Sequence, residues 1–146
     1  MKKGFTLVEL LGVIVVLSII LVIAVPRILD VIDNSQKQKF LNDVREITEI
    51  AKLHYEKEGE DFVTIDFSGQ GTETTETGEE KPLDFILDFE GEMPISGIIY
   101  FTDNQNNETI DMTKIDVVLE NVTSSNGKWC ANKNYGEDIV VTRCEE

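Results

Sequence analysis

The 146-residue chain has very little of what metal centres and catalytic sites are built from. It contains one histidine, His54, and two cysteines, Cys130 and Cys144. These residues are too few for a zinc site with four Cys or His ligands. The sequence also has no nucleophile-elbow, zinc-protease or phosphate-cradling glycine motif. We therefore expect no catalytic residues, no bound cofactor and no metal ligands, which means that the chain is not an enzyme.

Basic residues are also scarce. Only 13 Lys and Arg side chains stand against 28 Asp and Glu, which gives a net charge of −15. An acidic surface repels phosphates, and no stripe of Lys and Arg with interleaved aromatic residues offsets that repulsion. We expect no direct contact with nucleic acid.

One long hydrophobic run is present at the N-terminus. From Phe5 to Val25 the sequence is almost wholly Val, Leu and Ile, and Glu9 is the one ionisable residue. This length and composition predict a membrane-spanning helix. A secretory signal would follow its apolar run with a small-x-small cleavage site, whereas here the small residue, Gly4, precedes the run. Cleavage after Gly4 would leave the helix attached, and the basic pair 2–3 would hold that end in the cytoplasm.

The sequence Lys-Lys-Gly-Phe-Thr-Leu-Val-Glu-Leu-Leu at positions 2–11 resembles the cleavage and methylation motif of type IV prepilins. The resemblance is close over roughly the first 30 residues, and it includes Gly4, Phe5, Glu9 and Pro26. It implies that prepilin peptidase cuts between Gly4 and Phe5 and methylates the new Phe5 amine. It also implies that Phe5, Glu9 and Pro26 act in filament assembly. Removal of residues 1–4 leaves 11 basic against 28 acidic side chains.

Glu9 needs compensation, because a carboxylate in a membrane helix costs about 2–3 kcal/mol on insertion scales. One interpretation is that it lies close enough to the cytoplasmic headgroups to stay hydrated. The other, implied by the resemblance, is that it pairs in the filament with the Phe5 amine of a neighbouring subunit. Pro26 has two interpretations as well: a bend or loosening at the membrane exit, or the local loss of helix that pilins show when packed in filaments.

The pattern along the chain predicts an α+β fold, in which a long N-terminal helix packs on a C-terminal antiparallel β-sheet, as in pilins. A second apolar stripe at helical spacing continues the first helix to about 50 residues; it comprises Phe40, Val44, Ile47 and Ala51, with Leu41 and Ile50 beside it. The expected segments are a leader at 1–4, a membrane and filament-core helix at 5–25, an amphipathic helix half at 26–58, an exposed polar loop at 59–82 and a β-sheet head at 83–146. Within the head, strands are expected at 85–89, 97–102, 115–120, 128–132 and 138–143, with turns at 103–107, 124–127 and 134–136.

Three features of the head have more than one interpretation. Cys130 and Cys144 follow a membrane signal, so a disulfide is favoured over two buried thiols. Trp129 precedes Cys130 in an expected strand, so the two side chains point to opposite faces of the sheet. Trp129 is either a core residue or a surface contact, and the core is favoured. The stretch 103–108 is dense in oxygen ligands and resembles the calcium loops of major pseudopilins, but it lacks EF-hand spacing. A polar hairpin turn is the simpler interpretation, and we name no metal ligands there.

Three functions fit these features. The first is a structural subunit of a type IV pilus, with adhesion or twitching motility as its consequences. Its partners would be copies of itself, minor pilins, prepilin peptidase and the assembly machinery; the precursor would sit in the cytoplasmic membrane with its head outside. The second is a pseudopilin of a type II secretion or DNA-uptake machine. The pair Cys130 and Cys144 modestly favours a pilin over a pseudopilin. The third, a membrane-anchored binding protein that never polymerises, leaves Gly4 and Glu9 unexplained.

Overall fold

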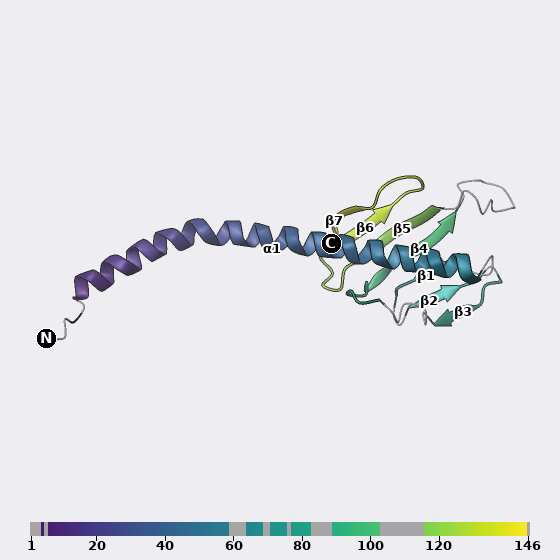
Figure 1. Ribbon diagram of the computed structural model, residues 1–146, viewed down its shortest axis with the longest axis horizontal. Helices are drawn as coiled ribbons and strands as arrows, with labels where there is room; N and C mark the ends of the chain where they lie inside the picture. Colours follow the sequence, from purple (N-terminus) through teal and green to yellow (C-terminus); the bar gives the residue numbers. More distant parts are fainter. Residues whose placement is uncertain are drawn as a thin grey trace. The chain divides into compact units, whose positions relative to one another are not determined.

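The computed structural model describes Gly4 and residues 6–58, 64–68, 71–75, 77–82, 89–102 and 116–145. The chain divides into two units, residues 1–36 and residues 37–146. The helix α1 (Leu7–Glu58) has 52 residues and runs through both of them (Figure 1). This confirms the prediction of one helix of about 50 residues followed by an antiparallel sheet, an α+β arrangement.

In the C-terminal unit, the helix buries one apolar stripe against the sheet. Phe40, Val44, Ile47 and Ala51 are at most 5% exposed, as their helical spacing predicts. The stripe continues one turn further, to Tyr55, whose ring stacks on Phe101 of the sheet with 4.5 Å between ring centroids. The core therefore forms between one helix face and one sheet face, which is how each element removes its apolar side from water.

The described sheet has seven strands in the order β3-β2-β1-β4-β5-β6-β7, and every neighbouring pair is antiparallel (Figure 1). Their bounds are β1 (Thr64–Asp66), β2 (Thr72–Thr74), β3 (Glu80–Pro82), β4 (Ser96–Thr102), β5 (Asp116–Thr123), β6 (Trp129–Lys133) and β7 (Val140–Arg143). Strands β4 to β7 correspond to four of the five strands expected from the sequence, within three residues at each end, as is usual for strand boundaries. The fifth expected strand, 85–89, and the expected turn 103–107 lie wholly or mainly outside the described residues.

The expectation of an exposed polar loop over 59–82 is wrong for the described part of that range. Three strands of three residues each, β1 to β3, extend the sheet there. Ile65 and Phe67 are buried in the core, and Thr75 is also buried. The segments of β2 and β3 show no apolar alternation, and their Thr, Glu and Lys side chains are typical of a loop. Around β1, Ile65 and Phe67 do alternate with polar residues, but this pattern is short and is followed by a long polar stretch. Threonine nevertheless favours strands, because its branched side chain fits a pleated surface.

Strands β4 and β5 approach each other closely at a double irregularity. The pairing register shifts on both sides of β5, once opposite Gly97 and once between Leu119 and Val122. Asn121, between these positions, has a φ of 48°, and its amide donates to Oδ1 of Asn132 on β6. Gly97 has a φ of 113°, and a Cβ there would lie 2.4 Å from Cα of Val122. Only glycine fits at this bulge.

A half-buried ion pair holds the beginning of β5 to the end of β6. The Lys133 ammonium lies 2.6 Å from Oδ2 of Asp116 and also donates to the Val117 carbonyl. The amides of Val117 and Gly136 donate to the same carboxylate. Burial by itself raises the pKa of Asp116, but these hydrogen bonds outweigh it, so the pKa lies below the ordinary value.

Candidate functional site

The N-terminus of α1 is closed by a reciprocal pair of hydrogen bonds between Thr6 and Glu9. The Thr6 hydroxyl accepts from the Glu9 amide at 3.3 Å, while Oε2 of Glu9 accepts from both the amide and the hydroxyl of Thr6 at 2.8 Å. This is a capping box, which satisfies amides that a helix leaves unpaired in its first turn. Glu9, which was interpreted from the sequence as hydrated or intermolecularly paired, is also a local capping residue.

From Leu7 to Val25 the surface of α1 is apolar on every side apart from Glu9, and its large hydrophobic side chains are between 46% and 84% exposed. Beyond Val25, exposed apolar side chains continue to Ile32 but share the surface with Arg27 and Asp30. The described chain has one helix apolar and long enough to cross a membrane, with a mean hydropathy of 3.1 in its most apolar window. The one hydroxyl of Ser18 is compatible with an apolar surrounding, because it donates to the Ile14 carbonyl of the same helix at 2.7 Å. Such a helix needs lipid or other apolar helices around it.

A shallow hollow lies on this surface beside Gly12. It is lined by Glu9, Gly12, Val13, Val16 and Leu17. Nothing in the structure lies within 4 Å of where a Gly12 Cβ would be. A glycine in a membrane helix lets a second helix come close. The carboxylate of Glu9 therefore lies beside an open, mainly apolar hollow.

The other residues singled out from the sequence lie at different places in the chain. Gly4 is exposed, and Phe5 lies outside the described residues. Pro26 is inside α1, and the helix is continuous through it. Its ring nitrogen cannot donate to the Val22 carbonyl, so the helix there is held by one hydrogen bond fewer than elsewhere. The expected loosening at Pro26 stays a prediction.

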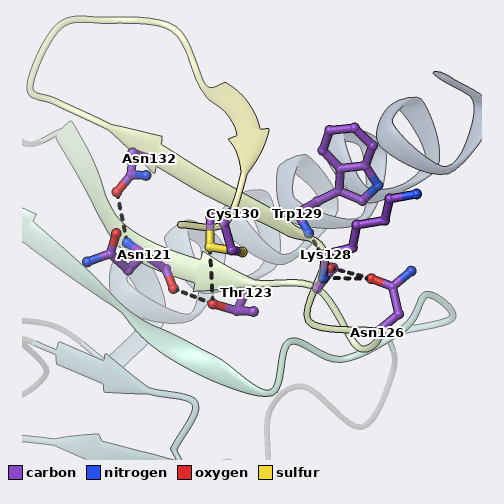
Figure 2. The surroundings of a disulfide bond; sticks show 9 residues. Asn121, Thr123, Asn126, Lys128, Trp129, Cys130 and Asn132 are labelled. Carbon is purple, nitrogen blue, oxygen red and sulfur yellow. Dashed lines mark hydrogen bonds between the residues drawn. A yellow bond between two sulfur atoms is a disulfide. The ribbon is translucent and has the colours of Figure 1, made fainter. Parts of the chain in front are cut away.

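Cys130 and Cys144 are joined by a disulfide that ties β6 to the residue following β7 (Figure 2). The sulfur of Cys130 lies 3.5 Å from the Thr123 hydroxyl, on the sheet face turned away from α1. Trp129 leaves β6 on the other side, and its indole is buried in the core at 6% exposure (Figure 2). The preference for a core position of Trp129 is therefore correct.

The remaining candidates among the described residues are metal-binding groups and His54. The described residues contain no group of three or more His, Cys, Asp and Glu side chains that could hold a metal ion. His54 is engaged with Glu73 on β2, with 3.1 Å between Nε2 and Oε2. This contact joins α1 to the sheet, as expected of a structural histidine. The stretch 103–108 lies outside the described residues.

Sequence reasoning missed the role of Thr6, although the signal was present. Thr6-Leu7-Val8-Glu9 has the Thr-x-x-Glu spacing of a capping box directly before an apolar run. The same residues also form the cleavage and assembly motif, so one short segment has both a local and an expected intermolecular role.

Comparison with known proteins identifies the same region. Residues 1–25 match the family model of the prokaryotic N-terminal methylation motif, which is the signature of type IV prepilins. No curated protein and no solved structure matches the chain. The motif supports a type IV pilin-like or pseudopilin precursor, a structural rather than an enzymatic protein that is anchored in a membrane before it assembles.

Proposed function

We propose that the chain is a structural subunit of a type IV pilus or pilus-like filament, polymerised through its N-terminal helix. The observation that carries this proposal is the combination of the methylation motif with an apolar helix surface that is exposed on all sides from Leu7 to Val25. A lipid bilayer covers that surface in the precursor. In a filament, the same helices from neighbouring copies cover one another, so that one surface serves both states.

Prepilin peptidase would cut between Gly4 and Phe5 and methylate the Phe5 amine. The exposure of Gly4 supports access to this bond. The cut removes the basic pair 2–3 and creates a new amine on Phe5, one residue before Thr6 and four residues before Glu9. Cleavage would thus remove the basic residues that orient the helix in the membrane and would leave a positively charged amine next to the capping box.

Glu9 would pair in the filament with the Phe5 amine of a neighbouring copy. The capping box engages one carboxylate oxygen, Oε2, and holds the carboxylate near the helix start. The other oxygen, Oε1, would accept from the neighbour's amine, and the hollow beside Gly12 would let that neighbour approach. Two charges buried together in an apolar bundle fix the register of the helices, because either one alone is costly.

The proposal is tested by mass spectrometry of the mature chain and electron microscopy of sheared cell-surface material. We expect a chain that begins with N-methylated Phe5, and filaments that contain it. An intact Met1 would refute processing and, with it, the proposed assembly. Correct processing without surface filaments would instead select a pseudopilin of a short envelope-spanning filament.

A further inference from the structure

A polar hollow lies beside the disulfide, and its volume is about 590 Å³. Small-molecule sites usually enclose about 300–1,000 Å³. Its lining includes two side-chain amides and two hydroxyls, from Asn121, Asn132, Thr123 and Thr142. Its charged side chains are one arginine and one glutamate, so the lining is polar without net charge. Such a lining suits a neutral molecule rich in hydroxyl groups, because it both donates and accepts hydrogen bonds.

The residues 121–123 have the sequence Asn-Val-Thr, the acceptor pattern for N-linked glycans. Both defining side chains, those of Asn121 and Thr123, line the same hollow. The Thr123 hydroxyl donates to the Asn121 carbonyl at 2.9 Å, which holds the two residues together (Figure 2). The pattern in the sequence is therefore also a pair of neighbouring groups in space.

The conformation of Asn121 explains its residue type but not the position of its side chain. A φ of 48° favours asparagine over most other residues. The backbone amide of Asn121 donates to Oδ1 of Asn132 at 2.8 Å, which fixes this part of the bulge. Asn121 is exposed, and its side-chain amide has no hydrogen bond with the rest of the described chain. The bulge thus presents an unengaged amide at the hollow.

We propose that Asn121 carries an N-linked glycan whose first sugar lies in the hollow beside the disulfide. The sugar donor is a polyprenyl diphosphate lipid. Nδ2 of Asn121 attacks the anomeric carbon, a C–N bond forms, and the C–O bond to the diphosphate breaks. The lipid diphosphate leaves, and Nδ2 gives one proton to a base of the transferase. The inference rests on the proposed function, in which the head lies outside the cytoplasm, since N-linked glycans belong to secreted chains.

The hollow supplies hydrogen bonds for the attached sugar. Oδ1 of Asn132 already accepts from the Asn121 amide, so Nδ2 of Asn132 is the group that donates to the sugar. The Thr142 hydroxyl lines the same space. Cys130 and Cys144 line it as well, so a sugar held there would cover their disulfide.

Mass spectrometry of the full chain purified from its own cells tests the attachment. Trypsin should release the peptide 115–128, in which Asn121 is the single asparagine of an Asn-x-Ser/Thr pattern. We expect this peptide to carry a carbohydrate mass, and fragmentation to place that mass on Asn121. The other such pattern, at Asn107 and Thr109, falls in a different tryptic peptide and lies outside the described residues.

Four variants separate the acceptor pattern from the fold. Thr123→Val and Asn121→Asp should each lower the glycosylated fraction of the peptide at least about tenfold, whereas Thr123→Ser should keep it within about twofold of wild type. Aspartate is chosen because it tolerates a positive φ. Asn107→Gln is the control and should leave the glycan on peptide 115–128 unchanged. Disulfide formation and Trp129 fluorescence are measured for each variant, so that a folding defect is recognised.

The position of the first sugar is tested without any substitution. The same chain is produced in a host that lacks lipid-linked sugars, and both forms are reduced with dithiothreitol in detergent micelles. We expect the disulfide of the glycosylated chain to be reduced at least about threefold more slowly, because reduction requires access to its sulfurs. Equal rates would show that the sugar does not lie in the hollow.

The outcomes distinguish this inference from the proposed function. A bare peptide 115–128 from processed, filament-forming chain would refute the glycan and leave the proposed function in place. A sugar mapped to Thr123, Ser124 or Ser125 would refute attachment to Asn121. A glycan on Asn121 of a chain that keeps Met1 and forms no filaments would support the inference, while the proposed function would fail.

Discussion

Gly97 and Asn121 bring β4 and β5 together at a point where an ordinary ladder would keep them apart. Each has a positive φ, and their backbones meet at the paired register shifts. The bulge lies within the part of β5 that pairs with β6, between the pairs Leu119–Lys133 and Val122–Ala131, and so it helps to place the disulfide. A conformational requirement at one glycine thereby influences the strand that carries Cys130.

Gly97→Ala should be strongly destabilising. The new Cβ would meet the Val122 backbone at 2.4 Å and would also have to adopt a left-handed φ. We expect a loss of about 2–4 kcal/mol in the free energy of unfolding, measured by urea unfolding of the full chain in detergent micelles. Gly136→Ala is the control, because Gly136 has a φ of 71° but nothing within 4 Å, and it should lose only about 1 kcal/mol. Equal losses at both positions would contradict the close approach.

Asp116 should make stability depend on pH. Its folded-state pKa is lower than its unfolded-state value of about 3.9. The stabilisation by its carboxylate is therefore fully present above the unfolded-state pKa and is lost as the pH falls through the folded-state pKa. At pH 6 we expect Asp116→Asn to be about 2 kcal/mol less stable than wild type, because it leaves Lys133 without its charge partner.

The difference between wild type and Asp116→Asn should shrink as urea unfolding is repeated from pH 5 toward pH 2. Glu120→Gln, at an exposed position of the same strand, serves as the comparison. A difference that stays constant over this range would show that the charge of Asp116 contributes nothing.

At the scale of elements, α1 serves two purposes along its length. Its first half exposes apolar side chains on all sides, and its second half buries one stripe against the sheet. The sheet edge farthest from β3 is held by a covalent bond, since Cys144, the residue after β7, forms a disulfide with Cys130 on β6. The amide of Cys144 also donates to the Lys128 carbonyl, which holds the same end.

Loss of the disulfide should weaken the C-terminal unit without changing the chain's insertion in the membrane. The cysteines are 14 positions apart. Closing a loop of this length stabilises by about 3 kcal/mol in the loop-entropy model. We expect Cys130→Ser/Cys144→Ser, and wild type after reduction, to lose similar amounts in urea unfolding. A reduced wild type as stable as the oxidised form would contradict this expectation.

How far the elements could be predicted depends on the strength of their periodic signal. The helix was predictable because its apolar run and the stripe from Phe40 to Ala51 extend over many turns. Strands β4 to β7 were predictable because Gly- and Asn-rich turns separate alternating residues. Strands β2 and β3 were not, because they are short and polar and are defined by pairing with neighbouring strands and not by local pattern. Strand β1 has a brief alternation at Ile65 and Phe67, and its place in the sheet depends on the pairing of Ile65 with Ile99.

The N-terminal motif was predictable as a processing and assembly signal, since its residues are adjacent in sequence. The meeting of Lys37 and Lys128 at the Trp129 ring was not predictable, because the two lysines are 91 positions apart and only the fold brings them together. The bulge at Gly97 was likewise invisible, since it depends on the approach of a second strand.

At the scale of the whole molecule, the chain must be stable in lipid and also in an assembly of its own copies. Glu9 belongs to both states, through its capping bond to Thr6 and through the proposed pairing with a neighbour's amine. These two roles differ in what they require: a capping box accepts Glu or Gln, whereas pairing with an amine requires charge.

Glu9→Gln and Glu9→Ala therefore distinguish the roles. Glutamine retains the cap and removes the charge, and alanine removes both. We expect both variants to insert in the membrane and to yield at least tenfold fewer filaments than wild type, by electron microscopy of sheared material. Thr6→Val, which removes the cap and keeps the charge, is the matched control and should assemble better than either. Wild-type filament yield from Glu9→Gln would reject the charge pairing.

Trp129 is the chain's sole tryptophan, so its indole is a built-in fluorophore. Because the indole is buried between α1 and the sheet, its emission depends on how the helix packs there. Unfolding of the C-terminal unit would expose the ring to water and shift its emission to longer wavelengths. Ordinary fluorescence on unlabelled protein can thus follow each of the urea unfolding experiments above, with no dye or tag attached.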